Sequence, residues 1–379
     1  MDTQEMAALG ARLKQAREQL ALSQKEVAAR MGFPSHQTII AIERGERAVK
    51  ALELSKFARL YARTVESLLL GEETTSRPAV AWRDRGNDAD ARLVEQRFLT
   101  YCEEYAGLEM LAEGKPTNFD LACAVKINDY DDAVRLGESL GRQLELGSHP
   151  AREMATVIEE HGVKVFVHDA GDAGSAAATR GGFGAGIMIN ERNAPWRVNY
   201  DIAHELFHLL TWEQLPCDAE PAPNGERALC DKFANAFAQA LLLPANSVRS
   251  EFEGHIRDHK LSYIDCVNMA RDFGVSTAAL LYRLENLRLL PRGSAKAAVG
   301  SPELKDVDRT VRKTDTRELP VGVPSRRFVA VAFKCLQAGR LSRSRFAELV
   351  NVGLHEVNAF LAERGYDVDR EYAGEISTA

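Results

Sequence analysis

The spacing of apolar residues predicts a bundle of five short helices at the start of the chain. Leu9, Leu13 and Ala16 recur at the interval that places side chains on one face of a helix. Ser23 suits the N-cap of a second helix, and Gly32 is the kind of residue that ends one. Three further segments with helical spacing follow before residue 70, so a small helical domain is expected there.

The rest of the chain divides by the same criterion. Residues 71–92 lack apolar periodicity and are expected to form a linker. Residues 93–290 combine helical segments with two short apolar stretches, VKVFVHD and GIMIN, that are expected to be strands. Residues 291–324 are polar and predict a linker or loop, and residues 325–379 return to helical spacing.

The closing helical segment contains LSRSRFAELVNVGLHEVNAFL, which again has the apolar spacing of two helices joined by a turn. This pattern is compatible with a simple packing domain. It is also compatible with a region that senses a ligand or nucleic acid, because its start at Arg326 is basic.

Composition indicates a modular globular protein. A chain of 379 residues with 45% apolar content predicts two or three domains. No apolar run reaches the ~18 residues of a membrane span, and the N-terminus lacks the basic-then-apolar order of a secretory signal. The six cysteines are scattered without a paired motif. We therefore expect a cytoplasmic protein with no disulfides and no membrane contact.

Charge is distributed unevenly along the chain. The formal net charge is −7, yet residues 8–63 carry eleven lysines and arginines against five glutamates. A basic module on an acidic body is expected when only one domain contacts phosphates.

The sequence HELFH carries the candidate catalytic chemistry. His204 and His208 lie four residues apart, so on a helix both imidazoles project from one face and can bind one metal ion. Glu205 can accept a proton from a water that the cation activates and pass it to a leaving amine. The spacing can arise by accident, but burying these three side chains in an apolar helix without a metal would be costly. The segment predicts one Zn²⁺ ion and a metallopeptidase.

Tetrahedral zinc in a catalytic site needs a third protein ligand. The segment CDKFANAFAQALLLP predicts a helix that offers Asp231, and its small alanines let two helices approach closely. Asp231 is the predicted ligand and Glu226 is the reserve. Either carboxylate could instead be an ordinary charge that the dipole at a helix N-terminus favours.

Several ordered motifs between Ala133 and Leu287, among them GAGIMIN, YDIAHELFHLL and DKFANAFAQALLLP, resemble the ImmA/IrrE family of metallopeptidases. The resemblance implies a zinc endopeptidase that inactivates a helix-turn-helix repressor, often in a stress response to DNA damage or on behalf of mobile elements. The family has a glutamate where this chain has Asp231, so the shorter side chain must reach farther. The family also frequently has glycine at the position of Phe207. Tyr200, in the NYDI that replaces the usual Arg-Phe-Thr lead, could line the active site or serve packing.

The segment LSQKEVAARMGFPSHQTIIAIERGER resembles the XRE family of helix-turn-helix regulators. The resemblance implies that the second helix of the motif enters the major groove of DNA. The residues expected to face base edges are His36, Gln37, Thr38, Ile40 and Ala41. The residues expected to meet phosphates are Gln24, Lys25, Arg44 and Arg47. A helical bundle used for protein contact is the alternative.

Together these features predict a mainly α fold with a small β-sheet. A five-helix helix-turn-helix bundle (residues 1–70) would precede a zincin-like α+β peptidase domain (93–290) and a helical C-terminal region (325–379). The expected protein is a transcription regulator that binds double-stranded DNA as a homodimer and cleaves a regulatory protein, such as a repressor or antitoxin, or its own linker. The alternative is a transcription factor whose metal site acts as a sensor or structural clamp.

Overall fold

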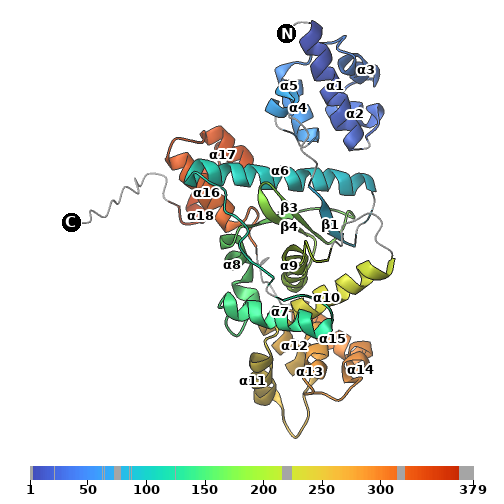
Figure 1. Cartoon of the computed structure of the whole chain (residues 1–379), viewed down its shortest axis with the longest axis vertical. Coiled ribbons are helices and arrows are strands. Elements are labelled where there is room, and N and C mark those ends of the chain that lie inside the picture. The colour runs from blue at the N-terminus through green and yellow to red at the C-terminus, as the bar shows by residue number, and fades with distance from the viewer. Residues whose placement is uncertain are drawn as a thin grey trace, which may run out of the picture.

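The structure is a computed structural model in which helices surround one four-stranded sheet (Figure 1). The predicted mainly α fold with a small sheet is confirmed. Among the residues described, no helix is long and apolar enough to cross a bilayer. The structure describes residues 3–20, 22–61, 63, 65–71, 78–84, 86, 88–123, 125–215, 224–313 and 321–366.

The N-terminal bundle has the five predicted helices. They are α1 (Thr3–Gln19), α2 (Gln24–Met31), α3 (Gln37–Glu43), α4 (Ala51–Tyr61) and α5 (Val65–Leu70). The Ser23 side chain caps α2, and Gly32 ends it with a φ of 75°, a conformation that glycine adopts without strain. The helices enclose an apolar core of their own, at whose edge Arg17 and Glu43 form a buried ion pair of 2.6 Å.

The sheet has the strand order β1-β3-β4-β2, and β2 is parallel to β4 while the other pairs are antiparallel. The strands are β1 (Val80–Arg83), β2 (Val163–His168), β3 (Ala176–Gly181) and β4 (Gly184–Asn190). Helix α9 (Pro195–Leu210) packs on one face and α6 (Asp88–Glu113) on the other (Figure 1). Because side chains alternate between the faces, Ile187 joins the core on the α9 side and Met188 the core on the α6 side.

Two segments predicted as linkers contain regular structure, and both predictions were wrong in part. Residues 71–92 include β1 and the beginning of α6. A four-residue edge strand owes its conformation to pairing with β3, far along the chain, and a local pattern does not reveal such pairing. Residues 291–324 include α14 (Ser294–Gly300) and α15 (Pro302–Lys313). Helix α15 needs only a narrow apolar stripe, which includes Leu304, because it packs on only one side of α12 (Tyr263–Asp272).

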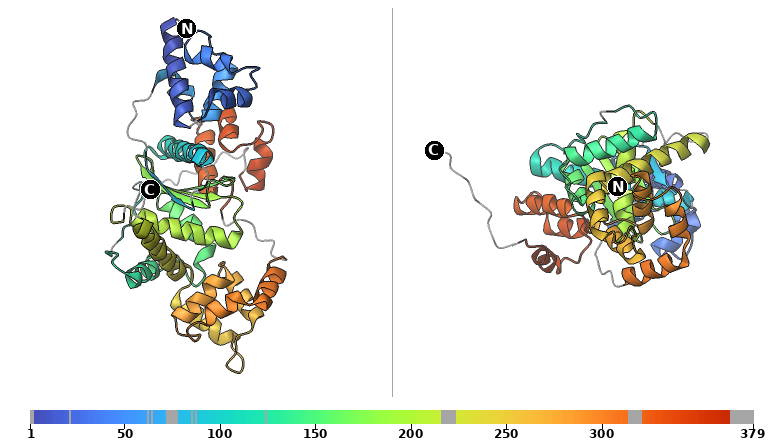
Figure 2. Two further views of the ribbon diagram at one scale, coloured as in Figure 1. Left: turned by 90° about the vertical axis from the view of Figure 1, so that its right-hand side faces the viewer. Right: turned by 90° about the horizontal axis from the view of Figure 1, so that it is seen from below.

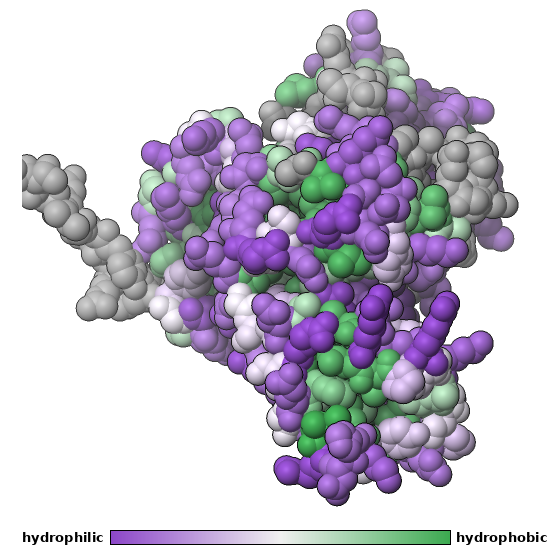
Figure 3. All heavy atoms as spheres, turned by 60° about the horizontal axis from the view of Figure 1, so that its bottom comes forward, coloured by the Kyte–Doolittle hydropathy of each residue, from purple (hydrophilic) through white to green (hydrophobic). Residues whose placement is uncertain are grey.

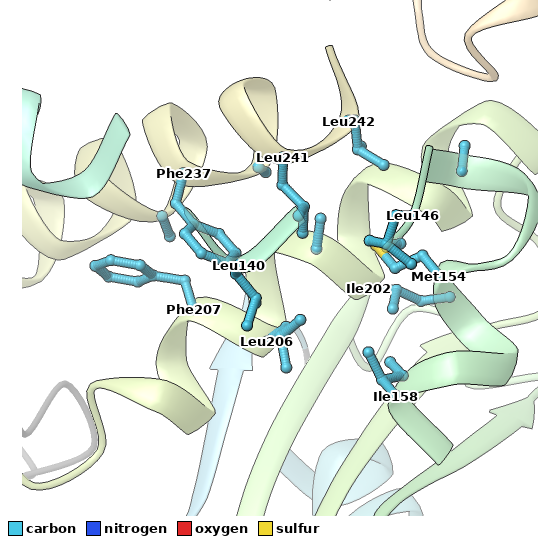
Figure 4. Packing of buried hydrophobic residues seen from close by; sticks show 14 of the residues in the cluster. Leu140, Leu146, Met154, Ile158, Ile202, Leu206, Phe207, Phe237, Leu241 and Leu242 are labelled. Atoms are coloured by element: carbon cyan, nitrogen blue, oxygen red, sulfur yellow. The ribbon is translucent and has the colours of Figure 1, made fainter. Parts of the chain in front are cut away.

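Helix α10 (Asn224–Leu242) lies between α9 and α7 (Tyr130–Gln143). Figure 4 shows the interlocked side chains, and the rings of Phe207 and Phe237 lie 5.6 Å apart. Gly137 on α7 permits the close approach, since a Cβ there would lie 2.6 Å from the Phe237 carbonyl oxygen. This packing fixes the separation of α9 from α10. The remaining elements of the body are η1 (Pro150–Arg152), α8 (Met154–Glu160), α11 (Ala245–His255) and α13 (Thr277–Asn286).

The C-terminal region forms α16 (Arg326–Gln337), α17 (Arg343–Leu349) and α18 (Val357–Glu363), which pack on one end of α6 (Figures 1 and 2). Residues 367–379 of the predicted helical region lie outside the part of the chain described. The Ser325 hydroxyl, at the start of α16, donates a hydrogen bond of 2.6 Å to the buried carboxyl of Glu159 on α8.

Glu159 is expected to make stability depend on pH. Burial raises the pKa of its carboxyl from the ordinary 4.5 to about 7, although the Ser325 hydrogen bond opposes the shift. The protonated form is therefore favoured on folding, and its contribution is complete below pH 4.5 and lost as the pH rises through 7. As the pH is raised from 5 to 8, the Tm of the Glu159→Gln variant should rise relative to that of the natural protein. Thermal unfolding scans at the two pH values measure this change. An equal difference in Tm at both pH values would contradict this assignment.

Candidate metal centre and DNA-binding surface

Helix α9 carries the HELFH segment through the interior of the central body. The helix begins at Pro195, a residue whose fixed φ suits the first turn. It is buried from Val198 to Leu210 apart from Tyr200, because the sheet covers one side of it and α10 lies against another. His204, Glu205 and His208 are consequently all buried.

Three candidate ligand atoms converge between α9 and α10. The Nε2 atoms of His204 and His208 are 3.2 Å apart, and Asp231 Oδ1 lies 3.8 Å and 3.9 Å from them. The nearest point equidistant from three atoms with these separations lies about 2.1 Å from each, within the range of zinc bonds to imidazole nitrogen and carboxylate oxygen. The residues present therefore fit a zinc ion. The shorter aspartate reaches the site because α10 packs directly against α9, where the rings of Phe207 and Phe237 lie 5.6 Å apart.

Asn235 fixes the tautomer of His204. Its Oδ1 lies 3.1 Å from His204 Nδ1, so this ring nitrogen carries the proton and donates it to the amide oxygen. The Nε2 lone pair is then directed to the point shared with His208 and Asp231. A partner of this kind is what a metal-binding imidazole requires.

The charge states of the three groups also suit a cation. Burial lowers the pKa of His204, and burial together with the neighbouring His204 lowers the pKa of His208 to about 3. Both imidazoles are therefore neutral near pH 7, the form that binds metal. Burial alone would raise the pKa of Asp231, but the two imidazoles and Arg227 outweigh it and the pKa lies below its ordinary value. Asp231 is half exposed, so solvent reaches the site from that side.

The segment predicted as a linker contributes to the wall of this site. Arg83, the last residue of β1, forms an ion pair of 2.5 Å with Asp201, which is buried one turn before His204. Burial raises the pKa of Asp201 to about 6, although Arg83 opposes the shift. Arg227 on α10 donates a hydrogen bond of 2.6 Å to the carbonyl oxygen of Trp82. Strand β1 thus joins both helices that carry the candidate ligands.

A cavity of about 550 Å³ adjoins the candidate metal centre. Asn235 belongs to both, because its side chain contacts His204 and also lines the cavity. Tyr200 lines the cavity too, and its hydroxyl donates to the Asn235 carbonyl oxygen at 2.9 Å. The other lining residues are mainly aromatic or polar: Arg83, Tyr130, Trp196, Arg197, Asp201, Gln239, Ser276, Ala279, Tyr282 and Asn286.

The predicted DNA contacts divide into two groups. Six of them are exposed or half buried on α2, on α3 and in the turn before α3: Lys25, His36, Gln37, Thr38, Ile40 and Ala41. Arg44, which follows α3, is also exposed. The other two have contacts within the bundle, since Gln24 donates to the buried Glu43 at 2.8 Å and Arg47 pairs with Glu53 at 2.7 Å. Their role in binding phosphates stays a prediction.

Sequence analysis missed Asn235, Arg83 and Asp201. Asn235 follows Asp231 by one helical turn, so its spacing could have revealed it. Arg83 could not be found because its segment lacks a pattern, and Asp201 carried no signal beyond its place one turn before His204. The side chain of Glu226, the reserve ligand, lies outside the part of the chain described.

Asn235→Leu is expected to lower zinc affinity by about 10- to 100-fold, because the substitution removes the acceptor that orients His204. Competition with a chromophoric chelator measures this change. Asn286 lines the same cavity without contacting either histidine, so Asn286→Leu serves as the control. Equal affinity in the two variants would show that Asn235 does not orient the ligand.

Two family models match parts of this chain. Residues 13–68 match the helix-turn-helix family, and residues 158–285 match the IrrE N-terminal-like domain, a peptidase family. No curated protein shows a significant match. The chain therefore joins a helix-turn-helix DNA-binding domain to an IrrE-like domain of the metallopeptidase type, and the predicted combination is confirmed.

Proposed function

We propose that this DNA-binding regulator is a zinc endopeptidase, in which His204, His208 and Asp231 hold one Zn²⁺ and Glu205 is the catalytic acid and base. The convergence of three ligand atoms about 2.1 Å from a common point carries the proposal. A buried glutamate on the same helix and an adjoining cavity support it.

The chain's own residues divide the work of hydrolysis. When bound, zinc supplies Lewis-acid chemistry, which polarises the scissile carbonyl and acidifies water. The carboxylate of Glu205 accepts a proton from the water that attacks the carbonyl carbon and donates it to the nitrogen of the leaving amine. The neutral imidazoles are kept in place by burial and, for His204, by Asn235. Burial also limits the access of competing water.

The cavity supports a protein segment as the substrate. Its walls combine aromatic rings with amide and hydroxyl groups, which suits the mixture of apolar side chains and peptide groups in an extended chain. Beside it, the surface at the α11–α15 end of the molecule carries hydrophobic residues among hydrophilic ones (Figure 3), and Ile264 and Tyr282 are exposed there. A regulatory protein such as a repressor or antitoxin is therefore the proposed substrate.

Cleavage of the chain's own linker is less well supported than it was by the sequence. Residues 80–83 are hydrogen bonded to β3, and α6 begins at Asp88, so these two parts of the segment 71–92 are not extended free chain that could enter a cleft. Residues 72–77 lie outside the part of the chain described. A homodimer that reads two half-sites of double-stranded DNA remains part of the proposal for the N-terminal bundle.

A comparison of protein N-termini in cells that produce the natural protein or Glu205→Gln would test the proposed function. New N-termini that depend on Glu205 would identify the substrate. If zinc is bound but no cleavage depends on Glu205, the alternative of a metal sensor or structural clamp holds instead.

A further inference from the structure

Residues 326–366 repeat the helix-turn-helix part of the N-terminal bundle. The Ser342 side chain caps α17 by accepting a backbone N–H three residues later, as Ser23 does for α2. Asn351 ends the first helix of the pair with a φ of 54°, in the place of Gly32 with a φ of 75°. Helices α2 and α17 therefore both begin with a serine N-cap and both end at a residue with a left-handed φ.

The buried positions also correspond. In the first helix, Phe346, Ala347 and Val350 are buried at the spacing of Val27, Ala28 and Met31. In the second helix, Val357, Phe360 and Leu361 are buried at the spacing of Ile39, Ile42 and Glu43. The turn between them is one residue shorter in the C-terminal copy.

One difference between the copies is a paired replacement. The N-terminal copy buries the Arg17–Glu43 ion pair, and the equivalent positions of the C-terminal copy are Leu336 and Leu361. Both leucines belong to one apolar cluster. Two apolar side chains can replace a buried ion pair without leaving a buried charge unpaired. The difference therefore agrees with a shared three-helix arrangement.

The surface of the C-terminal copy is suited to nucleic acid. His355, Asn358 and Ala359 are exposed in and before α18, at positions equivalent to Gln37, Ile40 and Ala41. Arg343 at the start of α17 donates a hydrogen bond of 2.7 Å to Asn358 Oδ1, which sets a guanidinium beside a carboxamide. These two groups are suited to the edges of guanine and adenine and to phosphates.

The charge of the C-terminal copy supports the same partner. Residues 326–366 contain seven lysines and arginines against three glutamates, in a chain of net charge −7. All three carboxylates are engaged, since Glu348 pairs with Arg345 at 3.2 Å, Glu363 lies 3.9 Å from Arg364, and Glu356 accepts the backbone N–H of Gly353 at 2.7 Å. Three of the seven cations pair with carboxylates of α6, namely Arg327, Lys334 and Arg345, so the positive charge that remains for a partner lies mainly on the others, which include Arg343.

The two copies are neighbours in space. Arg59 on α4 lies 4.0 Å from Glu348 on α17. Both lie away from α11–α15, with the N-terminal bundle beyond α6 and the C-terminal helices at one end of α6 (Figures 1 and 2). The two copies therefore touch through α4 and α17, and a duplex long enough to reach the exposed surfaces of both would bind the chain more tightly than either copy alone.

We propose that residues 326–366 form a second helix-turn-helix unit that contacts double-stranded DNA through Arg343 and the exposed face of α18. This contact adds to that of the N-terminal bundle and does not depend on peptidase activity.

Fluorescence anisotropy of the full chain with a labelled random-sequence duplex of about 40 base pairs tests the proposal over a range of salt concentrations. Arg343→Glu is expected to weaken binding about tenfold and to reduce the slope of affinity against salt by about one, and Arg343→Lys should retain most of the affinity. Arg309→Glu, the same charge change at an exposed site on α15, is the matched control. Circular dichroism verifies that each variant is folded.

Arg44→Glu separates the two DNA contacts. If the N-terminal contact exists, this variant binds more weakly than the natural protein, and adding Arg343→Glu should weaken binding further. A loss on adding Arg343→Glu in both backgrounds supports the second unit even if Arg44→Glu alone has no effect. The proposal is overturned if Arg343→Glu binds like the natural protein or like Arg309→Glu. Loss of self-association in sedimentation, with DNA affinity unchanged, would assign the unit to protein contact and also overturn it.

Discussion

Glu205→Gln is expected to slow peptide hydrolysis by about 10²–10⁴-fold, the usual contribution of a general acid and base. The amide is close in size to the carboxylate, so the fully buried position should remain well packed, but the amide cannot accept the proton of the attacking water. The rate constant kcat on a substrate found by N-terminal proteomics measures the effect. Zinc content should stay the same, because Glu205 is not among the proposed ligands.

Glu213→Gln provides the matched control for this prediction. Glu213 lies just beyond the end of α9 and is exposed, so the same chemical change there should leave kcat unaltered. A Glu205→Gln variant with the natural rate would remove Glu205 from the mechanism. A variant that loses both activity and zinc would instead show that the side chain supports the metal centre.

Asp231→Ala is expected to lower zinc affinity by more than the about 10- to 100-fold that loss of a supporting hydrogen bond costs, because it removes a direct ligand. The two histidines alone leave half of a tetrahedral site without protein ligands. Asp231→Glu keeps a carboxylate and should lose less. Calorimetric titration of zinc into the metal-free variants gives the affinities.

Glu226, the reserve ligand, provides an outcome that would contradict this prediction. Asp272→Ala, which removes a carboxylate at the end of α12, is the control for a general loss of charge. If Asp231→Ala binds zinc as tightly as the natural protein while Glu226→Ala does not, Glu226 is the third ligand and the assignment of Asp231 is wrong.

Local signals explain what could be predicted from the sequence. Ser23 and Gly32 mark the ends of α2 through backbone hydrogen bonds and a left-handed φ, and both act within a few residues. The spacing of His204 and His208 likewise needs only one helix. Such features do not depend on the rest of the chain, and for this reason the helical bundle and the candidate metal helix could be recognised.

Features that depend on distant pairing could not be predicted. Strand β1 exists because it pairs with β3, about a hundred residues later, and Arg83 then meets Asp201 on α9. The reach of Asp231 depends on the close contact of α10 with α7 at Gly137 and with α9, where the rings of Phe207 and Phe237 meet. The sequence suggested the helices, but only their packing sets the distance between the ligand atoms.

The similarity between the two ends of the chain could be predicted from the sequence only in part. The rhythm of the C-terminal segment was visible in the sequence, but the correspondence of caps, left-handed residues and buried positions required the structure. If both units contact DNA, the peptidase body is held to a duplex at two points. Proteolysis of a DNA-bound regulator would then take place beside its operator.

X-ray absorption at the zinc edge of the purified natural protein would test whether His204, His208 and Asp231 hold zinc, because it reports which atoms surround the metal. We expect one zinc per chain, bound by two imidazole nitrogens and carboxylate oxygen at about 2.0–2.2 Å. Protein that contains no zinc and takes up none, or zinc bound by sulfur at about 2.3 Å, would contradict it.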